Sequence, residues 1–220
     1  MTQRILVINP NSTLAVTQGI DRALEPLRLP GGPVFECATL TEGPPGIQTQ
    51  RDVDGVIGPL TRLIASRDHD CDAFVIACYS DPGLHSAREV TGKPVLGISE
   101  CGVLTALTVG HRFGVIAILA GSIPRHLRYL GAMGVSDRLA AELPVGLQVT
   151  ELSDVERTKS RLIDTGRRLV EDHGAHVVVM GCAGMAQYRR ALEDAIGVPV
   201  VEPTQAAAGM ALARVRLAGA

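Results

Sequence analysis

Two apolar, strand-like runs of this 220-residue chain each end in a cysteine. The two cysteines, Cys78 and Cys182, are 104 residues apart. After each one come a turn, a helical pattern and a second strand opened by proline, and these prolines, Pro94 and Pro199, are 105 residues apart. Matched landmarks at one spacing predict a chain made of two related halves, so each half brings one thiol to an equivalent position.

Strands and helices are expected to alternate along the chain, because short apolar runs alternate with amphipathic patterns. In the first half we expect strands at 5–9, 34–40, 74–78 and 95–98. A first helix is expected at about 11–27, capped by Asn11 or Ser12, and a second across 53–64 with a break near 55–59. A third helix is expected from residue 82, after an N-cap at Asp81. The stretch 111–117 is similar to 3–9 and restarts the pattern, with strands at 147–150, 177–182 and 200–201 and helices at about 121–133, 154–172, 185–196 and 204–216. Ser153 and Glu156 form a capping box for the second of these helices. The predicted fold class is α/β, with four parallel strands in each half.

The composition restricts the partners of this protein. A net charge of −2 without a basic cluster gives no electrostatic reason to expect nucleic acid or a membrane surface, and 3% aromatic residues without tryptophan argue against base or sugar stacking. No stretch approaches the roughly 20 apolar residues that span a bilayer, and the first residues lack the pattern of a signal peptide. We therefore expect a cytoplasmic protein with five reduced cysteines. Without a Cys-x-x-Cys or His-x-x-x-His pair, no metal site is predicted.

The two strand-end cysteines are the candidate reactive groups. Ligands of open parallel sheets bind beyond the carboxyl ends of the strands, where Cys78 and Cys182 are expected. The turn and helix after each cysteine are expected to favour its thiolate, the reactive base or nucleophile. A thiol-hydrolase pair of Cys78 with His85 is less favoured, because His85 lies about two helical turns away and no orienting Asn or Asp has a suitable spacing. A structural role is expected for the cysteines without a repeat partner, Cys37, Cys71 and Cys101.

Five motifs at or beside the predicted strand ends carry a resemblance to a known family. They are Val7-Ile8-Asn9-Pro10-Asn11-Ser12, Gly43-Pro44 with Ile47, Ala77-Cys78-Tyr79-Ser80-Asp81-Pro82-Gly83-Leu84, Pro94-Val95-Leu96-Gly97-Ile98-Ser99-Glu100 and Gly181-Cys182-Ala183-Gly184-Met185. Through them nearly the whole chain resembles hydantoin racemases, a family of the aspartate/glutamate racemase superfamily that includes allantoin racemases. The resemblance implies a homo-oligomer with two α/β lobes related by pseudo-two-fold symmetry and an active site in the cleft between them. We expect 1–100 plus 207–220 to form the first lobe and 101–206 the second.

The resemblance also implies an activity and a set of site residues. The activity is racemisation of a small-molecule substrate, a 5-substituted hydantoin or allantoin, without a cofactor or a metal. Cys78 and Cys182 match the family's pair of acid/base thiols, which exchange protons with opposite faces of one substrate carbon through an enolate. The implied substrate-binding positions are Asn11 and Ser12 in one loop, Ile47 in a second, and Tyr79, Ser80, Ala183 and Gly184, whose backbone N–H groups are expected to hold the enolate oxygen.

The chain departs from the family pattern after the fifth predicted strand. Hydantoin racemases often carry two threonines there, and this chain has Ala117-Ile118, which leaves the substrate less certain than the reaction. Three other activities of the superfamily remain alternatives. The first is an amino-acid racemase, although no acidic residue to bind an α-ammonium group stands near 9–12, and the second is a maleate-type isomerase in which one cysteine acts covalently. The third is an arylmalonate-type decarboxylase, although these decarboxylases have only one of the two thiols, the one that matches Cys182. A small-molecule binding protein without turnover is the alternative from another class.

Overall fold

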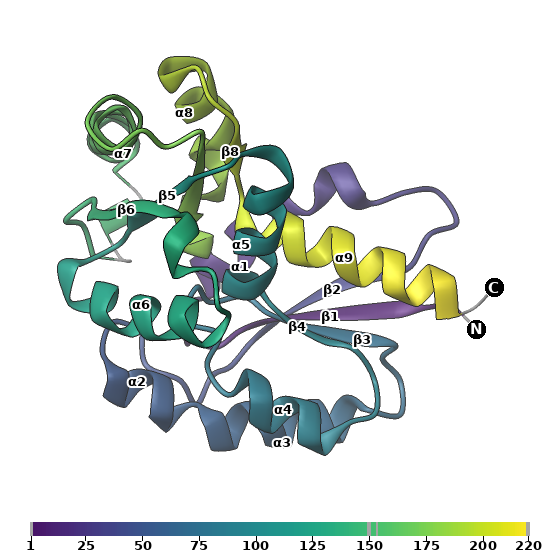
Figure 1. Cartoon of the computed structure of the whole chain (residues 1–220). Coiled ribbons are helices and arrows are strands. Elements are labelled where there is room, and N and C mark those ends of the chain that lie inside the picture. Colours follow the sequence, from purple (N-terminus) through teal and green to yellow (C-terminus); the bar gives the residue numbers. More distant parts are fainter. Residues whose placement is uncertain (1, 149–150, 153, 219–220) are drawn as a thin grey trace.

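Two four-stranded parallel sheets form the core of the protein (Figure 1). A computed structural model describes residues 2–148, 151–152 and 154–218. The first sheet has the strand order β2-β1-β3-β4 and the second β6-β5-β7-β8, so the second sheet repeats the first strand for strand. The strands are β1 (Arg4–Asn9), β2 (Val34–Thr39), β3 (Ala73–Ile76), β4 (Val95–Gly97), β5 (Phe113–Ala117), β6 (Leu139–Pro144), β7 (Val177–Gly181) and β8 (Val200–Val201). The predicted α/β class, with two equivalent four-stranded parallel sheets, is confirmed.

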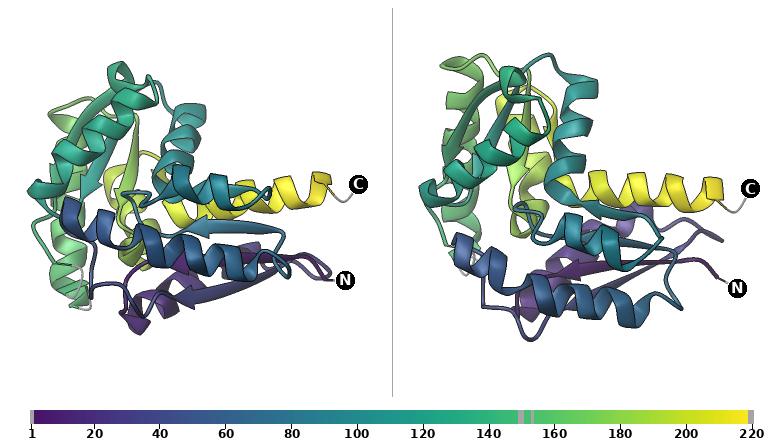
Figure 2. Two further views of the ribbon diagram at one scale, coloured as in Figure 1. Left: turned by 90° about the horizontal axis from the view of Figure 1, so that it is seen from below. Right: turned by 60° about the horizontal axis from the view of Figure 1, so that its bottom comes forward.

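Helices cover both faces of each sheet. They are α1 (Leu14–Ala23), α2 (Gln50–Gly55), α3 (Ile57–Arg67), α4 (Leu84–Val90), α5 (Ile98–Val109), α6 (Ile123–Ala132), α7 (Val155–Glu171), α8 (Arg189–Ile196) and α9 (Pro203–Ala218), with 3-10 turns η1 (Glu25–Leu27), η2 (Ala120–Ser122), η3 (Ser136–Arg138) and η5 (Ala183–Tyr188). Figure 1 shows α3 and α4 below the first sheet and α9 above it, and Figure 2 shows α9 running along that sheet towards the N-terminus. None of the helices described here is long and apolar enough to cross a bilayer.

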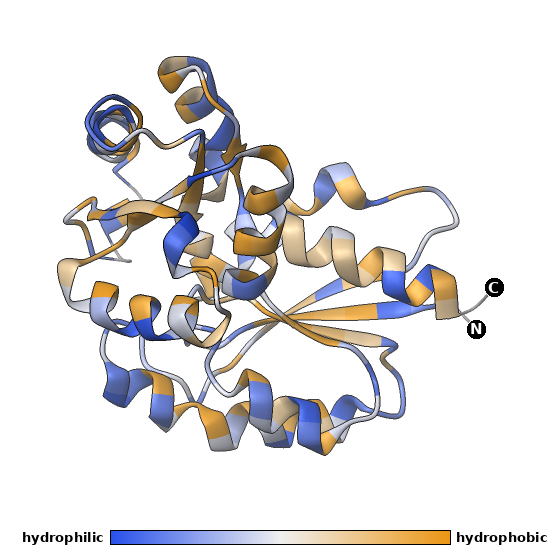
Figure 3. Ribbon diagram, viewed as in Figure 1, coloured by the Kyte–Doolittle hydropathy of each residue, from blue (hydrophilic) through white to orange (hydrophobic). Residues whose placement is uncertain are grey.

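The central strand β1 packs against helices on both of its sides. Ile5 and Val7 lie in a cluster with residues of α1 and α9, whereas Leu6 and Ile8 lie in a cluster with residues of α2, α3 and α4. All four side chains are fully buried. Figure 3 shows the strands of the first sheet as largely hydrophobic and the helices around them as mixtures of hydrophobic and hydrophilic residues. Because both faces of such a strand are covered, its sequence is a continuous apolar run, and this pattern predicted β1 correctly.

The predicted strand at 147–150 is wrong. The strand that pairs with β5 at one edge of the second sheet is β6, and every residue of β6 is partly exposed. An edge strand of this kind lacks the apolar run that marks a strand buried on both faces. Leu147 is buried in the segment after β6, which explains the misleading apolar pattern, while 149–150 lie outside the described residues.

The starts and breaks of the first-half helices also refine the prediction. Helix α1 begins at Leu14, with Thr13 at the N-cap position in place of the predicted Asn11 or Ser12. The Asn11 side chain still contributes, because its Oδ1 accepts the N–H of Thr13 at 2.9 Å. The predicted break within 55–59 is confirmed, since Val56 alone separates α2 from α3.

In the second half, Asp154 is the N-cap of α7 and its side chain accepts the N–H of Arg157 at 3.2 Å. The predicted capping residue, Ser153, lies outside the described residues. The helix predicted at 185–196 is divided into η5 and α8, and Gly197 ends it with a φ of 71°. The division of the chain into lobes at residues 100 and 207 stays a prediction.

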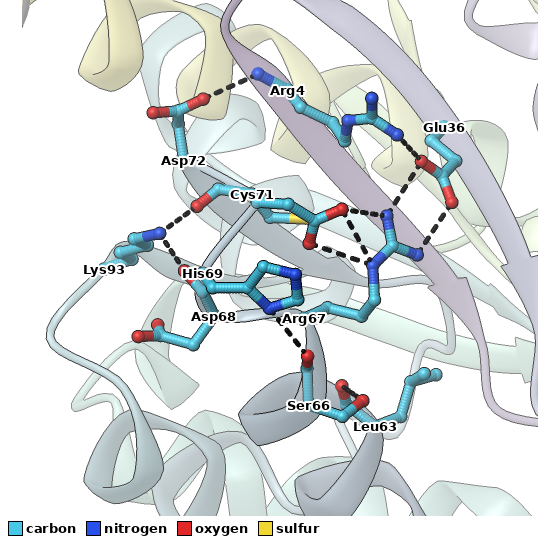
Figure 4. Close-up of polar contacts among 11 residues, drawn as sticks. Arg4, Glu36, Leu63, Ser66, Arg67, Asp68, His69, Cys71, Asp72 and Lys93 are labelled. Atoms are coloured by element: carbon cyan, nitrogen blue, oxygen red, sulfur yellow. Dashed lines mark hydrogen bonds and ion pairs between the residues drawn. The ribbon is translucent and has the colours of Figure 1, made fainter.

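A polar network closes the amino end of the first sheet (Figure 4). Arg67, the last residue of α3, donates to both carboxylate oxygens of Glu36 in β2 at 2.8 and 3.0 Å. It also donates to Asp70, at 3.0 Å from Nη2, and Arg4 of β1 forms a further ion pair with Glu36. Hydrogen bonds from Arg67 hold the pKa of Glu36 below its usual value, although burial opposes them. The network thus fixes α3 to two strands at the end of the sheet opposite Cys78.

We expect Arg67→Met to lower the free energy of unfolding by about 1 to 2 kcal/mol, because a bidentate carboxylate contact is lost. Arg62→Met is the matched control on the same helix, since the ion pair of Arg62 with Glu42 at 2.8 Å is largely exposed. Its effect should stay within about 0.5 kcal/mol. Urea unfolding of both variants measures the difference, and equal losses would contradict a structural role for the network.

Candidate active site

A small cavity lies where the carboxyl ends of the two sheets meet, and both strand-end cysteines stand in its wall. The segments that line it are the loop after β1, the loop after β2, the turn after β3, the segment from β5 into α6 and the turn after β7. The lining residues are Asn11, Val16, Ile47, Ala77, Cys78, Tyr79, Ser80, Ile118, Ser122, Arg125, His126, Gly181, Cys182, Ala183 and Gly184. All of the predicted site residues except Ser12 are therefore brought together in one wall.

Cys78 stands two residues after β3 and not inside the strand as predicted. Its carbonyl oxygen accepts the N–H of Asp81 at 2.9 Å, which closes a turn. Burial raises the pKa of the Cys78 thiol to about 12, and the N–H of Ser80, which hydrogen-bonds the sulfur, offsets only part of that rise. Helix α4 begins only at Leu84, six residues after Cys78, so stabilisation of the Cys78 thiolate by the N-terminus of this helix stays a prediction.

Cys182 directly follows β7 and begins the 3-10 turn η5. Its carbonyl oxygen accepts the N–H of Met185 at 3.1 Å. Burial raises the pKa of this thiol to about 11, again with a partial offset from a backbone N–H, that of Gly184. In both halves of the chain, therefore, the N–H two residues after the cysteine lowers the pKa of the thiol, and burial outweighs this effect. Burial thus favours the protonated form of both thiols.

The turn after Cys78 is tied to the start of α5 by Asp81. The Asp81 carboxylate accepts the N–H groups of Ser99 at 2.9 Å and Glu100 at 2.8 Å, so it caps α5 and not α4 as predicted. Gly83, with a φ of 67°, is the N-cap of α4 instead. Burial raises the pKa of Asp81 to about 7, against the effect of these two N–H groups. Gly97 leaves the space for this carboxylate, because a Cβ there would lie 2.3 Å from the Asp81 Cγ.

The loops after β1 and β2 hold one another beside the cavity. The buried Asn9 side chain donates to Asn11 Oδ1 at 3.0 Å, which orients the first loop. Ser12 donates its N–H to the carbonyl oxygen of Pro44 at 2.9 Å, so Ser12 joins the two loops without lining the cavity. The two loops approach each other closely at Gly43, since a Cβ on it would stand 2.3 Å from the Pro10 carbonyl oxygen.

We expect Gly43→Ala to lower the free energy of unfolding by about 1 to 3 kcal/mol, because the new methyl group must push two backbone segments apart. Gly55→Ala is the control, since a Cβ on Gly55 at the end of α2 would meet no atom within 4 Å. That change should leave stability unaltered or raise it by up to about 1 kcal/mol. Thermal unfolding of the two variants tests the close approach, and an unchanged Gly43→Ala protein would refute it.

Sequence reasoning missed two charged or ionisable residues of the cavity wall, Arg125 and His126 in the first turns of α6. Arg125 donates from Nε to the Ser80 Oγ at 3.0 Å. His126 Nδ1 lies 2.5 Å from the Glu142 Oε1, and the His126 ring packs edge-on against Tyr79 with ring centroids 5.1 Å apart. The internal repeat could have indicated this part of the site, because the segment after β5 corresponds in the repeat to the Asn11 loop after β1.

Sequence and fold are both similar to those of known racemases. A family model described as Asp/Glu/Hydantoin racemase matches residues 5–211. The chain is 36% identical over 205 residues to a hydantoin racemase of Pseudomonas sp. (strain NS671), covering 90% of this chain and 80% of the relative. It is 34% identical over 218 residues to a hydantoin racemase of Paenarthrobacter aurescens, covering 97% and 92%. The structure of an allantoin racemase from Klebsiella pneumoniae matches with a TM-score of 0.88 and 32% identity, over 99% of this chain and 89% of that one. The chain belongs to the Asp/Glu/Hydantoin racemase family.

Proposed function

We propose that this protein racemises 5-substituted hydantoins or allantoin by proton transfer between the substrate C5 and two cysteines, Cys78 and Cys182. The observation that carries the proposal is the presence of both thiols, one from each lobe, in the wall of one cavity. Membership of a racemase family and the similarity to hydantoin and allantoin racemases support the reaction and the substrate class. The enzyme is then an isomerase that needs no cofactor.

The C5–H of a hydantoin is acidic because a ring carbonyl stands next to it, and loss of the proton gives an enolate. Donors aimed at the enolate oxygen stabilise the transition state by several kcal/mol in a water-excluded site. The N–H groups of Tyr79 and Ala183 are suited to this role, because each directly follows a cysteine in the cavity wall. Among the described residues, neither of these N–H groups donates to a protein acceptor. Ser80 and Gly184 instead direct their N–H groups to the sulfurs.

Racemisation by this route needs one thiolate and one thiol at the same time. The thiolate removes the C5 proton from one face, and the opposite thiol delivers its own proton to the other face. After one turnover the charges on the two sulfurs are exchanged, so the enzyme is ready for the other enantiomer. Charge on Cys182 raises the pKa of Cys78 further, which favours a site that loses one proton and keeps the second.

Chiral chromatography after incubation with enantiopure L- or D-hydantoins and with allantoin tests the proposed activity. We expect each enantiomer to be converted to the racemate. Binding of these rings without conversion, measured by calorimetry, would contradict the proposal and favour a binding protein. Cytoplasmic location and homo-oligomeric assembly stay predictions, and size-exclusion chromatography with light scattering tests the second.

A further inference from the structure

The cavity wall contains a positive charge that the proposed proton transfer does not use. Arg125 is only 4% exposed, and its side chain lines the same cavity as Cys78 and Cys182. Its Nε donates to Ser80 Oγ at 3.0 Å. Within the part of the chain that the structure describes, no carboxylate lies within ion-pair distance of Arg125. A buried guanidinium without an anionic partner is costly, so its retention in a binding cavity points to a ligand.

The acidic residues around Arg125 are already engaged. Asp81 uses both carboxylate oxygens for backbone N–H groups at the start of α5. Glu142 is paired with His126, the neighbour of Arg125 in the chain. The charge of Arg125 helps to lower the pKa of Asp52, but one carboxylate oxygen of Asp52 accepts the N–H groups of Gln48 and Thr49. Among the described residues, none of these three carboxylates forms an ion pair with the Arg125 guanidinium.

The position of Arg125 restricts where an anion would lie. Ser80, which holds its Nε, is two residues from Cys78, and the charge of Arg125 acts on the Cys78 thiol by lowering its pKa. An anion on Arg125 would therefore lie beside the reacting carbon and not at a distant surface. The guanidinium nitrogens that remain form a planar fork that matches a carboxylate.

We propose that Arg125 binds a carboxylate on the C5 substituent, so that the preferred substrates are hydantoins with a short acidic side chain. This inference rests on the proposed racemase function and names its substrate class. Hydantoin-5-acetate and hydantoin-5-propionate are the simplest rings of this type. They differ from their carboxamide analogues by one charge at nearly constant shape, so each acid and its amide form a matched pair of probes.

The test compares kcat/KM for racemisation of each acid and its amide by the wild type, Arg125→Gln and Arg125→Lys. We expect the wild type to prefer the acids by about 100-fold or more, since the amides leave the guanidinium without its anion. In Arg125→Gln the ratio of kcat/KM for each acid to kcat/KM for its amide should fall to about one, and Arg125→Lys should recover part of the ratio. Arg128→Gln is the charge-matched control, because Arg128 stands on the same helix but is exposed and contacts Gln50 Oε1 at 2.8 Å.

Two outcomes would overturn the inference. The first is a wild type with the same kcat/KM for the acids and the amides, and the second is an Arg125→Gln protein in which kcat/KM falls by the same factor for both. Calorimetric binding of the same pairs separates this inference from the proposed function. If no hydantoin is racemised but acids bind more tightly than amides through Arg125, the racemase proposal fails and the carboxylate site stands. If neutral hydantoins are racemised without any acid preference, the racemase proposal stands and the carboxylate site fails.

Discussion

Cys78→Ser and Cys182→Ser are each expected to slow racemisation by about 1,000-fold or more in both directions, because each direction needs one thiol as base and the other as acid. A serine hydroxyl is far too weak an acid to supply the missing alkoxide base at neutral pH, although it keeps the size of the side chain. Initial rates from each enantiomer, followed by circular dichroism, measure the loss. The effect should be as large for Cys182 as for Cys78.

Cys37→Ser is the control for these variants. Burial raises the pKa of Cys37 to about 12, as it does for Cys78, but Cys37 lies in β2 and does not line the cavity. Its loss should leave the rate close to that of the wild type. Near-normal racemisation by either Cys78→Ser or Cys182→Ser would be incompatible with a two-thiol mechanism.

The rate of racemisation should rise steeply with pH. Burial raises the pKa values of Cys78 and Cys182 to about 12 and about 11, so at neutral pH only a small fraction of the free enzyme carries the thiolate. Well below a pKa the ionised fraction grows tenfold with each pH unit. We therefore expect kcat/KM to increase about tenfold per unit from about pH 7 to about pH 9.

Initial rates over this range, corrected for the base-catalysed racemisation of the substrate without enzyme, check the expected slope. The direction follows from the charge on the active form, since burial disfavours the thiolate and a higher pH restores it. A flat profile would mean that the reactive thiolate forms with a much lower pKa than the buried sulfurs indicate. A falling profile would exclude a thiolate base.

The parts of the fold that sequence predicted well are those buried on two faces. The strand before each cysteine is a continuous apolar run because helices cover both of its sides, and this is why the duplication was visible. The edge strand β6 was missed because its partly exposed residues lack such a run. Asp81 was assigned to the nearer helix, since a capping pattern in sequence does not show that the carboxylate reaches Ser99 and Glu100 across the sheet.

The candidate site shows the same limit. Cys78 and Cys182 were found because each follows a recognisable strand, and the resemblance to hydantoin racemases added the neighbouring loop residues. Arg125 was missed because an arginine in an amphipathic helix normally faces solvent, as Arg128 does three residues later. Only the packing of α6 against the turn at Ser80 turns Arg125 inward.

Deuterium labelling at low conversion tests the two-thiol mechanism most directly. A single enantiomer is incubated in D₂O, and the remaining substrate and the product are separated and analysed by mass spectrometry at low conversion. If Cys78 and Cys182 act from opposite faces, the product carries deuterium at C5 while the recovered starting enantiomer keeps its protium. Deuterium that enters the recovered enantiomer as fast as product forms, or protium retained in the product, would show that one base serves both faces and would contradict the mechanism.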